Sequence, residues 1–260
     1  MENEKFENKP KATEREDVIA GRNAVAEALK SGRAIDSLWV SKGEHGGNLP
    51  MLIAQCRKKD IPVKEVDSRK MDTLSRNHQG VIAFAACKEY AHLDDLFKAA
   101  EEKGEAPFFI LCDELEDPHN LGAILRTAEA AGAHGVIIPK RRAVGLTATV
   151  YKASAGAVEY VPVARVTNLT DTIKELKKRN MWVYGLDMNG ENWCSGDLTG
   201  PIAIVVGSEG RGISRLVREQ CDGILSLPMQ GNINSLNASV ACGIVLYEVC
   251  RQRAGLKAKN

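Results

Sequence analysis

The chain has 260 residues, of which 44% are hydrophobic, and its 35 Lys plus Arg nearly balance its 34 Asp plus Glu. This length and apolar content suffice for the buried core of one or two globular domains. The net charge of +1 excludes an overall basic surface for nucleic acid, so any polyanionic partner must be bound by local patches.

Seven cysteines are scattered along the chain, an odd number with no CxxC or Cys/His metal spacing. We therefore expect no metal site and interpret the cysteines as small buried hydrophobic residues in a reducing compartment. The N-terminus lacks the apolar segment of a signal peptide, and no segment is long and apolar enough to span a bilayer. These features predict a soluble, cytoplasmic protein.

The N-terminal third predicts a polar tail followed by a small α/β domain. Residues 1–16 are almost entirely polar and predict a disordered tail. In residues 17–91, apolar runs alternate with segments of helical period. We expect strands at 18–20, 35–40, 61–66 and 81–86, and helices at 23–30 and 49–59.

Residues 18–92 contain 12 Lys plus Arg against 8 Asp plus Glu. This excess of four suits phosphate contacts that position a nucleic acid. The alternative is that these are the lysines and arginines that any helix surface carries.

The charged segment 92–104 predicts a linker helix, and residues 105–260 predict a second domain. There, strands and helices alternate, which implies a mostly parallel sheet covered on both faces. Strands are expected at 108–112, 136–138, 181–186, 202–206 and 224–227, with another at the end of 147–163; helices are expected from 118 to a C-cap at Gly132, within 147–163, at 169–178, from about 213, and at 238–249, and residues 188–200 are expected to form a loop.

Three polar segments follow apolar strands of the second domain: DPHNLGAILRTAEAAG at 117–132, VVGSEGRGISRL at 205–216 and LPMQGNINSLNASVA at 227–241. Ligands of open α/β sheets bind beyond the carboxyl ends of the strands, so these segments can meet in one site. The residues that could converge there are Asn120, Arg126, Glu209, Ser235 and Asn237.

Each of these residues also has an ordinary structural explanation. Ser235 and Asn237 can cap the last helix, and Glu209 can be a turn carboxylate near a helix N-terminus. Arg126 can pair with a nearby glutamate. It also lies six residues after Asn120, so the two are not neighbours on one helix face, and a shared site requires a non-helical or bent chain around Asn120.

The string GSEGRG suggests a dinucleotide site, because glycines between a strand and a helix let the backbone approach a pyrophosphate. Its spacing is G-x-x-G-x-G and it lies late in the domain, whereas the fingerprint is G-x-G-x-x-G after the first strand. This disfavours a nicotinamide enzyme and an ordinary Rossmann methyltransferase.

Taken together, the three segments resemble the signature motifs of the SpoU (TrmH-like) RNA ribose 2′-O-methyltransferase family, within the SPOUT superfamily. The string GRNAVAEAL at residues 21–29 is similar to the N-terminal substrate-binding domain of the RlmB subgroup. Enzymes of that subgroup methylate the ribose of a guanosine in 23S ribosomal RNA. The resemblance extends from about residue 18 to residue 250.

The resemblance implies an L30e-like RNA-binding domain at 17–91 and a SPOUT methyltransferase domain with a C-terminal trefoil knot at 105–260. It implies S-adenosylmethionine as cofactor, held in the knot by backbone groups at Gly207, Leu227 and Leu236. It also implies a homodimer formed through the knotted domain, with both protomers contributing to each site, and 23S rRNA as partner.

The same resemblance implies that Asn120, Arg126, Glu209, Ser235 and Asn237 form the catalytic site. We expect Arg126 to bind a phosphate and stabilise the developing alkoxide, because a guanidinium does not readily give up a proton. The two asparagines and Ser235 would orient these groups, and Glu209 would hold Arg126 or the cofactor loop. The alternatives are the same chemistry on a tRNA or another rRNA nucleotide, and a non-catalytic rRNA-binding protein.

Overall fold

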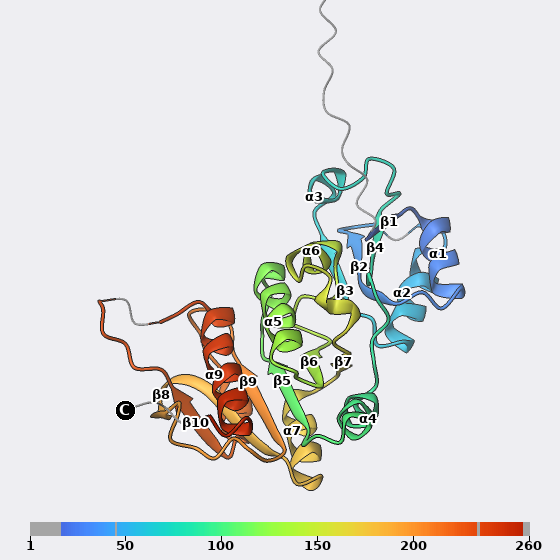
Figure 1. Ribbon diagram of the computed structural model, residues 1–260. Coiled ribbons are helices and arrows are strands. Elements are labelled where there is room, and N and C mark those ends of the chain that lie inside the picture. The colour runs from blue at the N-terminus through green and yellow to red at the C-terminus, as the bar shows by residue number, and fades with distance from the viewer. Residues whose placement is uncertain (1–16, 45, 233–234, 257–260) are drawn as a thin grey trace, which may run out of the picture. The chain divides into compact units, whose positions relative to one another are not determined.

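The computed structural model describes residues 17–44, 46–232 and 235–256. Contacts divide the chain between Ala85 and Ala86 into two compact units, each built around its own sheet (Figure 1). The predicted disordered tail, residues 1–16, lies outside the described residues. No helix in the described ranges is both long and apolar enough to cross a membrane.

Unit 1 contains a four-stranded mixed sheet in the order β1-β4-β2-β3, with only β2 and β3 parallel to each other. The predicted strands and helices are confirmed with small shifts at their ends. Helix α3 was not predicted; it is five residues long and is capped by Asp67, whose carboxylate accepts from the Arg69 N–H at 2.9 Å. The elements are β1 (Val18–Ala20), α1 (Arg22–Lys30), β2 (Ile35–Ser41), α2 (Leu49–Lys58), β3 (Val63–Val66), α3 (Ser68–Asp72) and β4 (Val81–Ala85).

Unit 2 contains a six-stranded sheet in the order β10-β8-β9-β5-β6-β7, and every neighbouring pair is parallel. The predicted parallel sheet is thus confirmed. The elements are α4 (Leu93–Lys103), β5 (Phe108–Cys112), α5 (Pro118–Ala130), β6 (Gly135–Pro139), α6 (Ala148–Ala153), η1 (Ala157–Glu159), β7 (Val163–Val166), α7 (Leu169–Lys178), β8 (Trp182–Asn192), β9 (Ile202–Val206), α8 (Arg215–Arg218), β10 (Gly223–Ser226) and α9 (Ala238–Arg253).

Two apolar layers cover the faces of this sheet, as expected for a parallel sheet. Side chains alternate along β5, so Phe108 and Ile110 belong to one core cluster and Phe109 and Leu111 to the other. The first cluster includes buried residues of α5, α6 and α9, and the second includes those of α4 and α7. The sheet is therefore rigidly held, and its loops are positioned by two packed layers.

Four segments of unit 2 differ from expectation. The strand expected at the end of 147–163 begins only at Val163 as β7, because residues Ala157–Glu159 form η1 instead. The expected linker 92–104 forms α4, which packs into unit 2: Leu96 is fully buried in its core and fills the space beside Gly135. Strand β8 extends to Asn192, where its exposed end pairs with β10. Residues 188–200 were expected to be a loop because this exposed end carries no apolar pattern. Helix α8 is only four residues long. The trefoil knot and the L30e-like likeness stay predictions.

The cysteines are only partly the buried residues that we expected. Cys56, Cys112 and Cys242 are buried, whereas Cys87 and Cys194 are exposed. Burial raises the pKa of the Cys112 thiol to about 12 and that of Cys56 to about 11, so these two thiols stay protonated at neutral pH.

Candidate functional site

The three polar segments meet at the carboxyl edge of the unit 2 sheet. Five residues separate the end of β5 from the start of α5, and the loop 207–212 directly follows β9, the hydrogen-bonded neighbour of β5. The third segment follows β10 and leads into α9, which packs beside α5 (Figure 1). The parallel topology thus brings together residues that lie more than 100 positions apart in the chain.

Asn120, Glu209 and Asn237 form one hydrogen-bonded cluster, which we call the Asn120–Glu209–Asn237 cluster. Asn120 Nδ2 donates to Glu209 Oε1 at 3.1 Å. Asn237 Nδ2 donates to Asn120 Oδ1 at 2.9 Å and to Glu209 Oε1 at 2.5 Å. Asn120 is only 4% exposed, whereas Glu209 and Asn237 reach the surface. Each residue comes from a different predicted motif, so the expected convergence is found for these three.

Asn237 is also the N-cap of α9. Its Oδ1 accepts from the backbone N–H groups of Ser239 at 3.0 Å and Val240 at 3.2 Å, and from the Ser239 hydroxyl at 2.6 Å. Asn237 therefore serves both as a helix cap and as a member of the cluster, because its Oδ1 accepts from the start of α9 while its Nδ2 donates to Asn120 and Glu209. The cap fixes the amide, and the fixed amide orients Asn120 and Glu209.

The glycines of the second motif explain how Glu209 is presented. Gly210 and Gly212 have φ of +79° and +66°, a conformation that glycine adopts at little cost. Ser208 and Gly212 exchange two backbone hydrogen bonds of 3.1 and 2.9 Å, which closes the loop around Glu209. A side chain at Gly207 would collide with the backbone of Gly212. The glycine spacing thus builds a tight turn that carries a carboxylate.

Asp113 was missed by the sequence analysis. It directly follows β5, is 5% exposed, and its Oδ2 accepts from the Ser214 N–H at 2.7 Å. This bond fixes the chain immediately beyond the Glu209 loop. A carboxylate at the end of a buried strand was the available signal, but its partner lies 101 residues away.

Arg126 and Ser235 do not join the cluster. Helix α5 is continuous from Pro118 to Ala130, so Arg126, six positions after Asn120, projects about 120° away from it around the helix axis. Arg126 is exposed and makes no hydrogen bond or ion pair with any described residue. The expected contact from Glu209 to Arg126 is therefore not present in the protomer; Glu209 holds the two asparagines. Ser235, two positions before Asn237 in the chain, is exposed.

A pocket of about 380 Å³ opens beside the cluster. It lies where the loops after β5, β6 and β9 meet, and its walls carry acidic, basic and amide side chains. The lining consists of Glu114, Leu115, Glu116, Asp117, Asn120, Arg142, Ser208, Glu209 and Arg211. Among the described residues, no group of three or more His, Cys, Asp or Glu is arranged to hold a metal ion.

The three expected cofactor-binding residues also lie in the loops at this edge. Gly207 has no space for a side chain, so only its backbone can contact a ligand. Leu227 packs against the core, whereas Leu236 is 39% exposed and Met229, in the same loop, is 38% exposed. Backbone groups beside exposed apolar side chains suit the adenosine and methionine parts of S-adenosylmethionine.

Family models match both units of the chain. Residues 18–91 match the domain described as RNA 2′-O ribose methyltransferase substrate binding, and residues 107–247 match the SpoU rRNA Methylase family. The chain is 53% identical over 243 residues to a Bacillus subtilis protein, YacO, assigned to the TrmH family of tRNA/rRNA methyltransferases. That match covers 93% of this chain and 98% of the relative.

Solved structures give the same picture. The SpoU methyltransferase AviRb of Streptomyces viridochromogenes, in complex with AdoMet, is 26% identical with a TM-score of 0.59, over 92% of this chain and 90% of that one. An AdoMet-bound rRNA methyltransferase of Sinorhizobium meliloti is also 26% identical, with a TM-score of 0.57, over 93% and 88%. With its motifs placed at one sheet edge and both units matched, the chain belongs to the SpoU rRNA methylase family.

Proposed function

We propose that the protein transfers a methyl group from S-adenosylmethionine to the ribose 2′-hydroxyl of a guanosine in 23S ribosomal RNA. As a member of the SpoU family, the chain is an S-adenosylmethionine-dependent RNA methyltransferase. The proposed ribose chemistry is supported chiefly by one observation: the Asn120–Glu209–Asn237 cluster borders a pocket of about 380 Å³.

The chemical problem is to align a weakly acidic hydroxyl with an electrophilic methyl group. Alignment of two reactants supplies on the order of 7–11 kcal/mol of such a barrier. The cluster suits this task because its three side chains fix one another in place. We infer that Asn120, Ser235 and Asn237 orient the ribose and that Glu209 keeps the two asparagines in register.

The bound cofactor supplies the electrophilic methyl group. We infer that backbone groups at Gly207, Leu227 and Leu236 hold it, with the apolar side chains of Met229 and Leu236 against its adenosine. This assignment rests on the family resemblance and is supported by the lack of space for a side chain at Gly207 and by the exposure of Met229 and Leu236.

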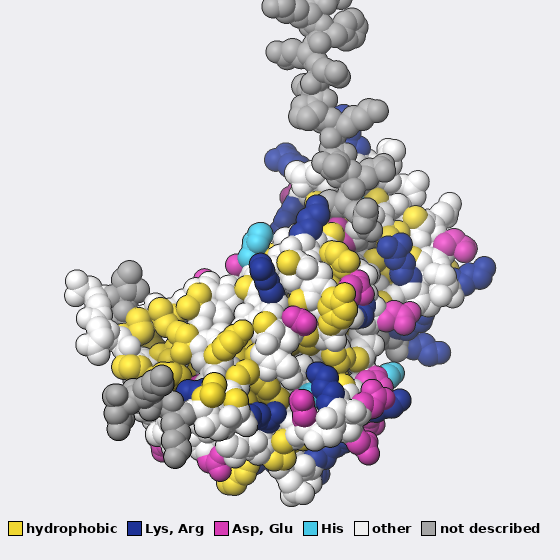
Figure 2. Space-filling view, viewed as in Figure 1, with side chains coloured by type: hydrophobic (Ala, Val, Ile, Leu, Met, Phe, Trp, Pro, Cys, Tyr) yellow, Lys and Arg dark blue, Asp and Glu magenta, His cyan; other side chains and the backbone are white. Residues whose placement is uncertain are grey.

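We further propose that the protein is a homodimer through unit 2. Two large apolar side chains of α9, Val240 and Tyr247, are 51% and 55% exposed, and hydrophobic side chains gather over this helix (Figure 2). Thr127 of α5 packs against Gly243 on the same helix, so Arg126 lies next to the α5–α9 contact. An Arg126 that bonds to no described residue of its own protomer suits a residue that serves the partner's site.

Ribosomal RNA is favoured over tRNA by the extent of the structural likeness. The rRNA methyltransferase of S. meliloti matches 93% of this chain, whereas the A. aeolicus TrmH/SpoU tRNA-modifying enzyme, 29% identical with a TM-score of 0.53, matches 62%. The tRNA enzyme is thus similar to a smaller part of the chain. An RNA-binding unit 1 suits a larger RNA.

The direct test incubates the protein with labelled S-adenosylmethionine and, separately, 23S rRNA, 16S rRNA and bulk tRNA. We expect 2′-O-methylation of one guanosine in 23S rRNA, and the same position should be unmethylated in cells that lack the protein. Methylation of tRNA alone would contradict the proposed target, and transfer to a base would contradict the proposed chemistry.

Subunit mixing tests the position of Arg126. Arg126→Ala and Asn237→Ala proteins are each expected to be inactive, but a mixed dimer regains one complete site if Arg126 serves the partner. Recovered activity on mixing therefore supports the shared site, and no recovery after verified subunit exchange would contradict it.

A further inference from the structure

We infer that Arg142 and Arg211 form a clamp for RNA phosphate at the mouth of the pocket, and that Glu114 holds the clamp in its binding geometry. This inference rests on the proposed function and names the cations that position the target nucleotide. Both arginines line the same pocket as Asn120 and Glu209. Arg126, which we expected to bind phosphate, is not in that lining.

The clamp is built from three loops at the carboxyl edge of the sheet. Glu114 follows β5, Arg142 follows β6, and Arg211 lies in the loop after β9. The first two loops are joined by a backbone hydrogen bond of 2.9 Å from Val144 N–H to Leu115 C=O. The two guanidinium groups therefore come from different loops that are fixed to a single rigid sheet.

One carboxylate engages both arginines. Arg142 Nη1 lies 2.9 Å from Glu114 Oε1, and Arg211 Nη1 lies 3.9 Å from Glu114 Oε2. The Glu114 side chain is 19% exposed, whereas those of Arg142 and Arg211 are 78% and 85% exposed. Arg142 thus donates one hydrogen bond to Glu114, Arg211 lies at ion-pair distance from it, and both guanidinium groups present their remaining N–H groups to solvent at the pocket mouth.

The backbone at this ion pair is also unusual. Glu114 and Arg142 both have positive φ, 52° and 55°, which is uncommon for residues with a side chain. Two such residues that pair with each other beside a pocket indicate loops held in a defined shape by their surroundings. A surface ion pair with no such constraint would not need this conformation.

The chemistry of the lining favours phosphate at this place. Arginine forks bind phosphate oxygens through paired, charge-assisted hydrogen bonds. The lining also carries four carboxylates, of which Glu114 faces the arginines and Asp117 caps α5 through the His119 N–H at 2.8 Å. Glu116 and Glu209 repel a phosphate elsewhere in the pocket, so the arginine side is where an RNA phosphate can bind.

The test compares Arg142→Ala, Arg211→Ala and the double variant with Arg141→Ala, an exposed neighbouring arginine outside the pocket lining. Each clamp variant is expected to raise KM for RNA about tenfold and to lower the slope of log affinity against log salt by about one. The loss should appear chiefly in KM and less in the turnover number at saturating RNA, and the Kd for S-adenosylmethionine should stay unchanged. Arg→Lys variants should recover part of the loss.

Glu114→Gln separates positioning from charge. Both cations remain, so KM should rise while the salt slope stays close to that of the wild type. Clamp variants that match Arg141→Ala in KM and salt slope would overturn the inference, as would a loss confined to cofactor binding.

The proposed function and the clamp fail in different ways. If the wild type methylates an RNA other than 23S rRNA, the same KM comparison is made on that RNA. If it methylates none, the affinities of wild type and variants for a 23S fragment decide the clamp alone.

Discussion

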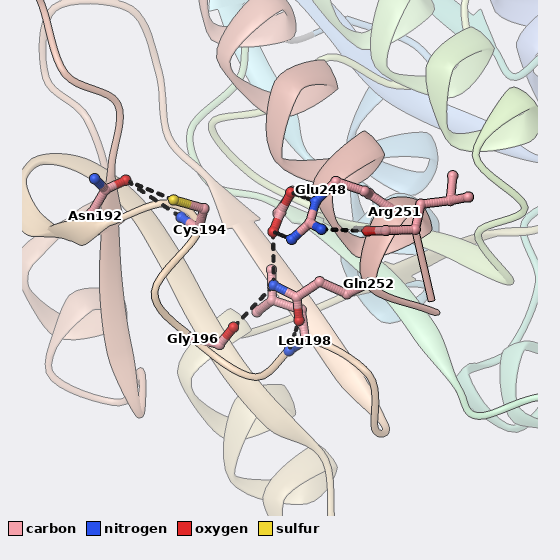
Figure 3. Close-up of polar contacts among 8 residues, drawn as sticks. Asn192, Cys194, Gly196, Leu198, Glu248, Arg251 and Gln252 are labelled. Carbon is pink, nitrogen blue, oxygen red and sulfur yellow. Dashed lines mark hydrogen bonds and ion pairs between the residues drawn. The ribbon is translucent and has the colours of Figure 1, made fainter. Parts of the chain in front are cut away.

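Both ends of helix α9 carry a network of polar side chains, but only the network at the N-terminal end borders a pocket. At the N-terminal end, Asn237 joins Asn120 and Glu209 beside a pocket. At the C-terminal end, Glu248 Oε1 and Oε2 each accept from Arg251 at 2.7 Å, and Gln252 Nε2 donates to Glu248 at 2.8 Å (Figure 3).

The C-terminal network binds only the protein itself. Gln252 also donates to the Gly196 carbonyl at 3.0 Å and accepts from the Leu198 N–H at 2.8 Å, which ties α9 to the loop between β8 and β9 (Figure 3). The Glu248 side chain is only 2% exposed, and both its oxygens are bonded. This network stabilises the fold, whereas the N-terminal cluster keeps polar groups at a pocket.

The largest effect on this comparison is expected from removing the Asn237 side chain. Asn237→Ala deletes both donors that fix Asn120 and Glu209, so we expect single-turnover methyl transfer to fall about 10²–10³-fold. It also deletes the helix cap, which should lower the free energy of unfolding by about 1 kcal/mol. Asn237→Ser is the matched control: it retains a cap but cannot make both bonds, so its stability should approach that of the wild type while transfer stays slow. A fast Asn237→Ser enzyme would assign Asn237 to capping alone.

At the opposite end, Glu248→Ala should affect stability instead of catalysis. Arg251 and Gln252 lose their shared acceptor, and we expect the free energy of unfolding to fall by about 2 kcal/mol in urea titrations. Methyl transfer per folded molecule should stay unchanged. The control is Glu219→Ala, which breaks an exposed pair with Arg215 at 2.7 Å and should cost less than about 0.5 kcal/mol. Equal losses in the two variants would show that burial of Glu248 adds nothing.

Glu209→Gln sharpens the comparison within the cluster. The amide oxygen can still accept from both asparagines, but without the charge, and charge-assisted bonds are about twice as strong as neutral ones. We expect transfer to slow about tenfold, with Glu209→Ala slower still. If Gln and Ala reduce the rate equally, the charge matters more than the geometry.

The smallest expected effect is in the pH dependence of stability. Hydrogen bonds from Arg251 hold the pKa of the Glu248 carboxyl below its ordinary value. A carboxyl with a depressed folded-state pKa contributes stability above its unfolded pKa of about 4.3, and this contribution is lost as the pH falls through the folded-state value. The stability difference between wild type and Glu248→Gln should therefore shrink below about pH 4. A difference that stays constant from pH 7 to pH 3 would contradict the proposed linkage.

Much of unit 2 could be predicted because its strands are buried on both faces. Phe108–Cys112 and Ile202–Val206 are continuous apolar runs, and both strands end where the runs end. Asn120 and Glu209 could be placed because each follows such a strand, whereas Asn237 follows β10, a short strand in which only Leu225 is buried. The exposed end of β8 could not, since polar residues that pair only through their backbone leave no periodic signal.

The hydrogen-bond partners of buried polar groups could not be predicted from the sequence. Asp113 and Ser214 are 101 residues apart, and nothing local indicates that they are bonded. Arg126 shows a further limit: the regular geometry of α5 turns its side chain away from Asn120 of the same protomer, and its place in a site shared between protomers stays a prediction.

The Asn237 side-chain amide has no hydrogen left to donate to a ligand. An amide nitrogen carries two hydrogens, and Asn237 Nδ2 has committed both, one to each of its partners. Any bond from a ligand to this amide must therefore displace an existing one. Within the described chain, Glu209 Oε2 has no bonded partner, so it is the vacant acceptor that an incoming hydroxyl can use without dismantling the cluster.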